Sequence, residues 1–268
     1  MNNNPIEQAV HTIGQINRLN YHAKREIYAR LIPIELAERF HLNPFLVDKN
    51  GSDLLELECP VGSTSAEMNL KHKKDFIDPI LYGHITDTIT GHLHILLYIL
   101  NDPESPRFDV DRLPDGTSTK FGTRYRNIEA EIKAMNYGLA PGQVRRGLGL
   151  LGEAIETFEA FVQSLGHELY FVEPLYYHNA VIFENYGFTY EKGRRLMERI
   201  QRGFSPEGEL RSKLNSTTPF RLPVAAASVR LRSWAIHDGI LGEPYANVTM
   251  YKRVGKSAGV KTCIECEW

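Results

Sequence analysis

The sequence has no surplus of charge of either sign. Its 31 lysine and arginine residues are matched by 33 aspartate and glutamate residues, so the formal net charge is only −2 over 268 residues. Proteins that bind nucleic acids obtain much of their affinity from a cationic surface that neutralises phosphates. We therefore expect no nucleic-acid partner.

Long apolar runs and cysteines are also scarce. The most apolar stretch, residues 95–100, is far shorter than the roughly 20 residues that span a bilayer. The polar residues 1–5 do not have the cationic start and apolar core of a signal peptide. With three cysteines, a disulfide scaffold is not expected. These absences predict a cytoplasmic protein with no membrane partner.

The composition is otherwise ordinary for a globular protein, with 42% hydrophobic and 24% charged residues. Apolar spacing and composition predict helices at 6–31, 34–42, 126–137, 148–165, 178–185, 194–202 and 225–236. Alternating or dense apolar runs predict strands at 54–59, 65–72, 79–87, 92–101, 168–173, 187–192 and 248–254. Strands cluster in the first half and alternate with helices in the second, which predicts an α/β or α+β fold with a mixed sheet.

The strand expected at 92–101 differs from the others, because its dense apolar run is typical of a strand buried on both faces. A second unusual stretch, residues 141–149, lies directly before the helix expected at 148–165. Gly147 and Gly149 let the backbone approach a ligand closely, and the unpaired N–H groups and dipole of the helix favour an anion such as pyrophosphate. Arg145 and Arg146 add positive charge there. The alternative is a glycine-rich turn with two solvated arginines.

Residues 144–149 resemble the acyl-CoA pyrophosphate loop of the GCN5-related N-acetyltransferase superfamily, (Gln/Arg)-x-x-Gly-x-(Gly/Ala). In that family a long helix, a short strand and a short helix with an aromatic-Gly-Phe turn follow, and residues 148–188, ending in Tyr186-Gly187-Phe188, are similar. Residues 81–85, 92–101 and 249–252 extend the likeness. The resemblance implies one acyltransferase-like domain over residues 1–268, with a mostly antiparallel central sheet flanked by helices and insertions at about 102–140 and 194–244.

The resemblance also implies acetyl-CoA or another acyl-CoA as co-substrate and no metal. The pantetheine chain would pair with the strand 92–101 where it separates from 168–173, and backbone N–H groups there would polarise the thioester carbonyl. The residues implied in cofactor binding are Val144, Arg145, Arg146, Gly147, Leu148, Gly149, Leu100, Asn179 and Phe183.

The chain departs from the family pattern at three places. Val144 stands where Gln or Arg is usual, and residues 102–140 separate the cofactor strand from the loop. Phe183 stands where many relatives have a tyrosine that protonates the leaving thiolate, and a phenyl ring has no proton to donate. Tyr177, Tyr186 or water would have to take that role.

An amine that attacks the thioester directly also needs a general base. His84, His92 and His94 lie on expected strands, and His92 and His94 face the same side of one of them. We take His94 as the candidate base; the alternatives are ordinary sheet positions or a zinc site that lacks a clear third ligand. Glu173 either meets the amine or caps the turn before Pro174.

Other polar and aromatic groups have two interpretations each. Glu129 and Glu131 either approach the acceptor or, as isolated glutamates commonly do, form a solvated helix face. An aromatic group at 170, 171, 176 and 177 either lines a pocket or, as favoured here, packs in the core. Cys263 and Cys266 form a CxxC pair that lacks further zinc ligands, and the tail 260–268 alternates enough to form an added strand.

The leading hypothesis is an acyl-CoA-dependent N-acyltransferase acting on a small amine or amino-acid-like acceptor. The first alternative is a catalytically inactive acyl-CoA-binding or assembly module with the same fold, which Phe183 favours. The second is transfer of a long acyl chain from acyl-CoA or an acyl carrier protein, with the insertions forming a tunnel or docking face. A homodimer is compatible with each.

Overall fold

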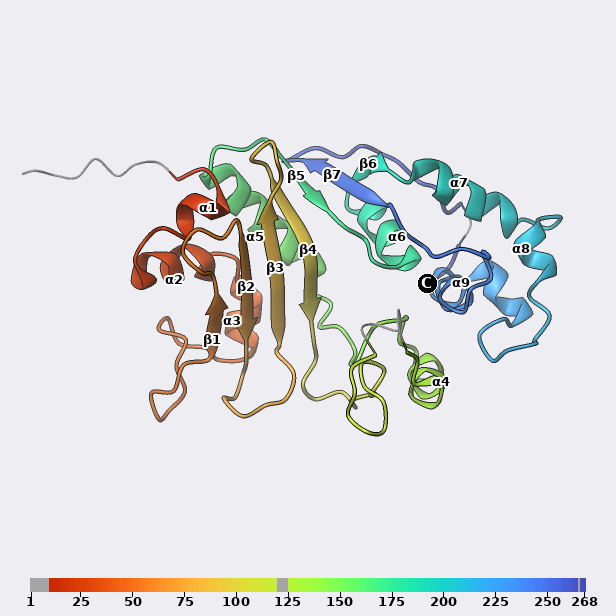
Figure 1. The fold of residues 1–268 in the computed structure, drawn as a ribbon, viewed down its shortest axis with the longest axis horizontal. Coiled ribbons are helices and arrows are strands. Elements are labelled where there is room, and N and C mark those ends of the chain that lie inside the picture. The colour runs from red at the N-terminus through yellow and green to blue at the C-terminus, as the bar shows by residue number, and fades with distance from the viewer. Residues whose placement is uncertain (1–9, 120–124, 265) are drawn as a thin grey trace, which may run out of the picture. The chain divides into compact units, whose positions relative to one another are not determined.

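The computed structural model describes residues 10–119, 125–264 and 266–268. It has a mixed α/β fold in which a seven-stranded, mostly antiparallel sheet is flanked by helices (Figure 1). The strand order is β1-β2-β3-β4-β5-β7-β6, and the strands are β1 Leu55–Glu58, β2 Ser65–Leu70, β3 Leu81–Asp87, β4 Leu93–Leu100, β5 Leu169–Val172, β6 Thr189–Lys192 and β7 Thr249–Arg253. The mixed sheet expected from the sequence is confirmed.

The chain divides into two compact units. The first contains Met1–Asn101, Leu148–Val172 and Arg253–Gly255, and the second contains Asp102–Gly147, Glu173–Lys252 and Lys256–Trp268. The segments 102–140 and 194–244, expected as insertions into one domain, both belong to the second unit. Residues 120–124 of the first segment lie outside the described residues.

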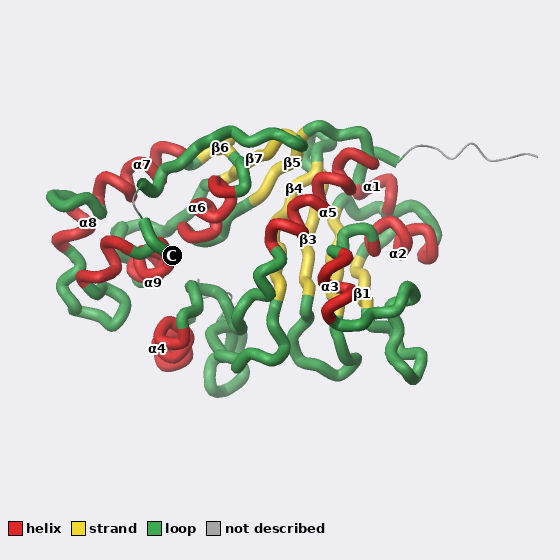
Figure 2. Tube along the Cα trace, turned by 180° about the vertical axis from the view of Figure 1, so that it is seen from behind, coloured by secondary structure: helices red, strands yellow, loops and turns green. Residues whose placement is uncertain are grey.

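The first unit packs helices on one face of β1–β5. The helices are α1 Ile13–Ile16, α2 Tyr21–Ala29, α3 Ile34–Arg39 and α5 Leu151–Ser164. Figure 2 shows α3 and α5 in front of these strands. Residues of β2 and β3 alternate between buried and half-buried, and β1 to β4 pair antiparallel in chain order. Tyr28 and Phe158 from α2 and α5 share a cavity of about 10 Å³ with strand residues of the buried face, namely Leu57, Ala66, Met68, Gly83, Ile85 and Tyr98.

The helix expected at 6–31 is interrupted. Residues 6–9 lie outside the described part, and the rest forms α1 and α2 with a break between them. Asn17 ends α1, and its side-chain amide donates hydrogen bonds to the carbonyls of Ser63 and Ser65 at 2.8 and 2.9 Å. Asn20 then caps α2 by accepting from the Ala23 N–H at 3.0 Å. Such side-chain bonds compete with helix continuation, which apolar spacing alone does not register.

The second unit is mainly helical. It contains α4 Ile128–Tyr137, α6 Tyr177–Asn185, α7 Arg194–Gly203, α8 Glu209–Ser212, the 3₁₀ helix η1 Pro223–Ala227 and α9 Val229–His237. Strands β6 and β7 pair antiparallel. Its apolar core joins α4 to α9 and is made of Val110, Ala130, Ala134, Met135, Leu139, Phe220 and Trp234.

Two local expectations in this unit need correction. The helix expected at 225–236 divides at Ser228, whose hydroxyl caps α9 by accepting from the Leu231 N–H at 3.3 Å. In the described part of the tail 260–268, the expected strand is reduced to an isolated bridge between Glu267 and Ser228. Gly138 ends α4 at a φ of 98°, as expected for a C-terminal glycine.

Among the residues that the structure describes, no helix combines the length and apolar character needed to cross a membrane.

Candidate functional site

Strand β4 is less covered than its sequence predicts. Only Leu93 is buried, and each residue from 94 to 100 is half-buried. The expectation of burial on both faces was therefore wrong. The reason is that β4 has a neighbour along its whole length on the β3 side only: its parallel pairing with β5 comprises His94 with Phe171 and Ile95 with Val172.

The two strands part directly after this short pairing, because β5 ends at Val172 while β4 continues to Leu100. The ladder with β3 is also irregular here. His84 pairs with Leu97 and Ile85 pairs with Ile95, so Leu96 is an extra residue in β4. A bulge of this kind turns the local backbone groups away from regular ladder geometry. Beyond Ile95, the half-covered segment of β4 therefore pairs with β3 and no longer with β5.

The candidate histidines lie on or beside these strands. His94 pairs with Thr86 and Phe171, and its ring centroid is 6.2 Å from that of Phe171. His92 precedes β4, and its ring lies 6.0 Å from the same phenyl ring, so the two histidines share a side as expected. His92 Nδ1 is 3.0 Å from the Thr90 hydroxyl.

His84 belongs to a polar group on the sheet face opposite the buried one. Its Nε2 lies 2.8 Å from the Ser65 hydroxyl and 4.0 Å from a carboxylate oxygen of Glu67. The other oxygen of Glu67 accepts a hydrogen bond from Tyr82 at 2.5 Å. Burial, followed by this hydrogen bond, raises the pKa of Tyr82 above its ordinary value. Sequence alternation places these residues on one face, but it does not identify their partners.

The glycine loop has the backbone features expected of it. Gly149 has a φ of 76° and open space around the position that a Cβ would take. Helix α5 begins two residues later, and its N-cap, Leu150, makes no side-chain capping hydrogen bond. The first N–H groups of α5 are therefore left for solvent or for an anion. Leu148 is buried and its carbonyl accepts from Arg39 at 3.1 Å.

The two arginines of the loop have different environments. Arg145 is 8% exposed, and its guanidinium donates to the backbone carbonyls of Pro103 and Ser105. Arg146 is exposed, and its guanidinium lies 5.2 Å from the Tyr137 ring centroid. Since Arg145 already binds carbonyl groups inside the second unit, Arg146 is the arginine whose charge faces solvent. Val144, half-buried, packs against the core of the same unit.

The candidate residues of α6 are also distinguished by their contacts. Asn179 accepts a hydrogen bond from the Tyr176 N–H at 3.2 Å and so caps its own helix. Phe183 packs on Phe188 with ring centroids 5.0 Å apart. Tyr177 is 1% exposed and donates to Cys263 Sγ at 3.1 Å, whereas Tyr186 is 38% exposed. Burial raises the pKa of Tyr177.

Two glutamates of α4 have opposite environments. Glu129 is exposed, in agreement with a solvated face, but Glu131 is 2% exposed, so that interpretation was wrong for Glu131. Its carboxylate binds Arg126 and lies 3.3 Å from His237 Nε2. Burial opposes ionisation, but hydrogen bonds from His237 and Arg126 outweigh it and lower the pKa of Glu131. The partners come from elsewhere in the chain, so helical spacing could not identify them.

The ion pairs of this group continue to Asp238, which binds Arg126 at 2.9 Å and Arg221 at 2.9 Å.

A separate buried polar pair lies nearby on α6 and α9: His178 Nδ1 is 2.9 Å from the Ser233 hydroxyl. Burial lowers the pKa of His178 to about 3, so the imidazole is neutral in the folded protein. Glu131, His178 and Ser233 are buried, which suits a structural role better than contact with a substrate.

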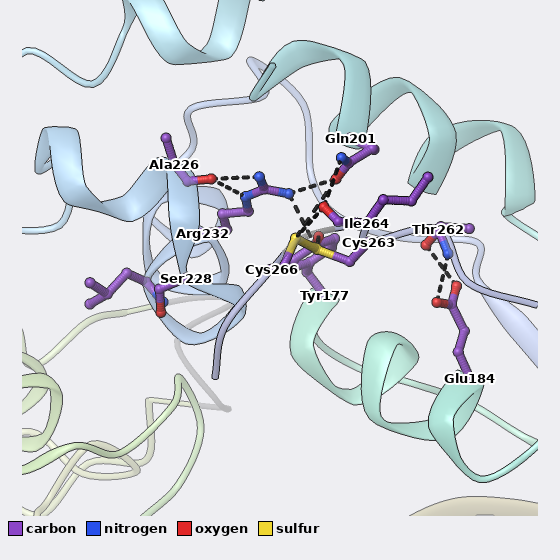
Figure 3. The surroundings of a disulfide bond; sticks show 11 residues. Tyr177, Glu184, Gln201, Ala226, Ser228, Arg232, Thr262, Cys263, Ile264 and Cys266 are labelled. Atoms are coloured by element: carbon purple, nitrogen blue, oxygen red, sulfur yellow. Dashed lines mark hydrogen bonds between the residues drawn. A yellow bond between two sulfur atoms is a disulfide. The ribbon is translucent and has the colours of Figure 1, made fainter. Parts of the chain in front are cut away.

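Three further candidates have simple outcomes. Glu173 is exposed and lies directly after β5, and among the described residues it has no hydrogen-bond or ion-pair partner that would cap the turn. Tyr170 is completely buried and its ring centroid is 5.1 Å from that of Phe158, which agrees with core packing. Cys263 and Cys266 are joined by a disulfide (Figure 3), while Cys59 is a buried free thiol. This is one short-range bridge and not a scaffold.

Within the described ranges, no group of three or more histidine, cysteine, aspartate or glutamate side chains is placed to hold a metal ion. No family model, no curated protein and no solved structure matches this chain.

Proposed function

We propose that the protein is an acyl-CoA-dependent N-acyltransferase that transfers an acetyl or similar acyl group to a small amine. The observation that carries the proposal is the half-covered segment of β4, where pairing with β5 stops after Ile95 and a bulge lies at Leu96. An acyl-pantetheine chain is extended and carries amide groups, so it can pair with such a strand edge as a peptide would.

The glycine loop, residues 144–149, is the part of the chain that would bind the pyrophosphate of the same ligand in this proposal. Gly149 leaves open space, α5 starts without a side-chain cap, and Arg146 is exposed. Backbone N–H groups at a helix N-terminus, and a guanidinium shortly before that helix in the chain, are suited to a pyrophosphate. In this proposal Arg145 supports the loop from inside, because its guanidinium is engaged with the carbonyls of Pro103 and Ser105.

The chemistry would proceed by direct attack of the amine nitrogen on the thioester carbonyl. His94, at the point where β4 and β5 pair, would remove the ammonium proton, and the backbone N–H groups of the bulge would polarise the carbonyl. The leaving thiolate needs a proton, which Phe183 has no means of donating. With Tyr177 bound to Cys263, the exposed Tyr186 or water remains for this step.

The test is isothermal titration of the full chain with acetyl-CoA and with free CoA. Wild type should bind both saturably. Gly147→Trp, which places an indole in the loop, should weaken binding at least ~100-fold. Arg146→Ala should weaken it about tenfold, as expected for loss of one charge-assisted contact. Arg199→Ala removes an exposed arginine of α7 paired with Glu243 and serves as the matched control with unchanged affinity.

Absence of saturable binding in a folded wild-type protein would overturn the proposal. A second candidate is a module that binds acyl-CoA without turnover. Its specific support is that Phe183 replaces the proton donor and that the Tyr177 hydroxyl is engaged and buried. Tight binding with no CoA release from acetyl-CoA across a panel of amines would favour this candidate over the enzyme.

A further inference from the structure

The CxxC disulfide lies beside a buried cation. Arg232 of α9 is 4% exposed, and its guanidinium donates to the Ala226 carbonyl, to Gln201 Oε1 at 2.7 Å and to Cys263 Sγ at 3.3 Å (Figure 3). The guanidinium also lies 5.0 Å from the Phe204 ring centroid. Among the described residues, none of these contacts is with a carboxylate. Since the described partners of this buried cation carry no formal charge, the surroundings favour an anion at Cys263.

The two sulfur atoms have different neighbours. Cys263 Sγ receives two donors, the Arg232 guanidinium and the Tyr177 hydroxyl at 3.1 Å. Cys266 Sγ lies near acceptors instead, 3.6 Å from the Ile264 carbonyl and 3.9 Å from Gln201 Oε1. Donors stabilise a thiolate, whereas acceptors stabilise a protonated thiol. Once the bond is reduced, this asymmetry places the negative charge on Cys263 and the proton on Cys266.

The Glu184 carboxylate, which binds Thr262 next to Cys263, is already engaged. The Glu184 carboxylate accepts from the Thr262 N–H at 2.8 Å, from the Thr262 hydroxyl at 2.6 Å and from Tyr190. It opposes a thiolate at the neighbouring Cys263, but its charge is shared among three donors. The direct contact of Arg232 with the sulfur is therefore the stronger influence.

The bridge is not required to hold the tail in place. It joins residues only three apart, so it restricts the unfolded chain very little compared with a long-range disulfide. Hydrogen bonds anchor the chain on both sides of the pair. Thr262 binds Glu184, and Glu267 exchanges backbone hydrogen bonds with Ala227 and Val229 at 3.0 and 2.8 Å. After reduction the two cysteines remain side by side, which makes reoxidation easy.

We propose that Cys263 and Cys266 form a redox-active pair that exchanges with low-molecular-weight thiols, with Cys266 as the sulfur attacked and Cys263 as the leaving thiolate. An incoming thiolate bonds to Cys266 Sγ, and the electron pair of the broken S–S bond goes to Cys263 beside Arg232. A second thiolate then attacks the small-molecule sulfur of the mixed disulfide and releases Cys266, which takes a proton from water. Two thiols become one disulfide, and the protein pair gains two electrons.

The first experiment measures thiol reactivity in the full chain. The protein is reduced with dithiothreitol, freed of reductant and alkylated with iodoacetamide from pH 5 to 10, with each label located by peptide mass spectrometry. Cys263 should reach half-maximal reactivity at least about one pH unit below the ordinary thiol value of about 8.5. The buried Cys59 provides an internal comparison and should react slowly.

Matched variants identify the cause. Arg232→Gln should lower the alkylation rate of Cys263 at pH 6.5 about tenfold, and Tyr177→Phe, which removes one hydroxyl, about threefold. The control is Arg230, which lies two residues from Arg232 on the same helix and donates to the carbonyls of Met135 and Leu139. The variant Arg230→Gln should leave the alkylation rate of Cys263 unchanged. If Arg232→Gln does not fold, Arg232→Lys should retain most of the reactivity, and Tyr177→Phe still reports the contact.

The second experiment treats the oxidised protein with reduced glutathione and traps intermediates with acid. The mixed disulfide should form on Cys266. Glutathione found on Cys263, an ordinary alkylation profile for Cys263, or a rate unaffected by both Arg232→Gln and Tyr177→Phe would each overturn the proposal. The outcome does not depend on acyl-CoA binding.

Discussion

The sheet of the first unit and the helices of the second place their polar residues differently. On the sheet, His84 and Glu67 are partly exposed and His94 is half-buried. In the second unit, Glu131, Arg145, His178 and Arg232 are at most 8% exposed. Buried charges and polar groups are retained in a fold only when they are paired or hydrogen-bonded. The comparison indicates that these four polar groups of the second unit are held by partners inside the fold, while those of the sheet are more exposed.

The strongest test of this difference is removal of a buried charge. Glu131→Gln should lower the free energy of unfolding by about 3 kcal/mol, because Arg126 and His237 lose an anionic partner in a buried site. Glu56→Gln removes an exposed partner of Lys74 and should cost far less, because solvent screens an exposed ion pair. Urea unfolding at pH 7 measures both. Equal losses in the two variants would remove the distinction between the units.

Acid should affect the second unit through His178. Its pKa in the folded protein is about 3, against an ordinary value of 6.5. Between these values the unfolded chain binds a proton at His178 that the folded chain excludes. The contribution of neutral His178 to the free energy of unfolding is therefore complete above pH 6.5 and is lost as the pH falls toward 3. The limiting slope is about 1.4 kcal/mol per pH unit. The low pKa of Glu131 acts in the same direction, but below its unfolded value of 4.5.

The measurement is the free energy of unfolding at pH 7.0, 5.5 and 4.5. Wild type should lose stability between pH 6.5 and 4.5, and His178→Gln should show a flatter dependence over that interval. A variant with the same slope as wild type would mean that another group is responsible.

Removal of the half-buried His94 should have the smallest effect on folding. His94→Gln should change the free energy of unfolding by less than about 1 kcal/mol, since the residue as a whole is only half-buried and glutamine keeps a polar side chain there. In the proposed acyl transfer, it should lower kcat/KM at least ~100-fold near pH 7. His92→Gln, on the same side of the sheet, is the matched control. A large loss of stability in His94→Gln would place His94 among the structural residues instead.

The elements of the first unit were largely predictable because their signals are local. The alternation at 65–70 and 81–87 and the apolar run at 93–100 locate β2, β3 and β4 within a few residues. The helix 148–165 and its glycine loop were also recognisable. The interruption between α1 and α2 was not, because it depends on Asn17 bonding to Ser63 and Ser65, more than forty residues away.

The candidate site was predictable only as a set of residues. The pattern at 144–149 selected Arg145 and Arg146 together, and the structure separates them into one buried and one exposed side chain. The sequence likewise selected Tyr177 and Tyr186 as equal proton donors, but a contact with Cys263 distinguishes them. Periodicity assigns a residue to a face of an element and does not reveal what meets it there.

The sequence by itself thus determined the order and approximate bounds of the main helices and strands, the mixed sheet and the place of the glycine loop. Apolar periodicity, glycines and capping residues act over a few neighbouring residues, so their signals can be read directly from the sequence. Tertiary structure alone decided that β4 is half-covered, that Glu131 is an ion-pair residue and that Arg232 faces the sulfur of Cys263. Each of these outcomes depends on partners from distant segments, because burial and pairing are properties of the packed chain.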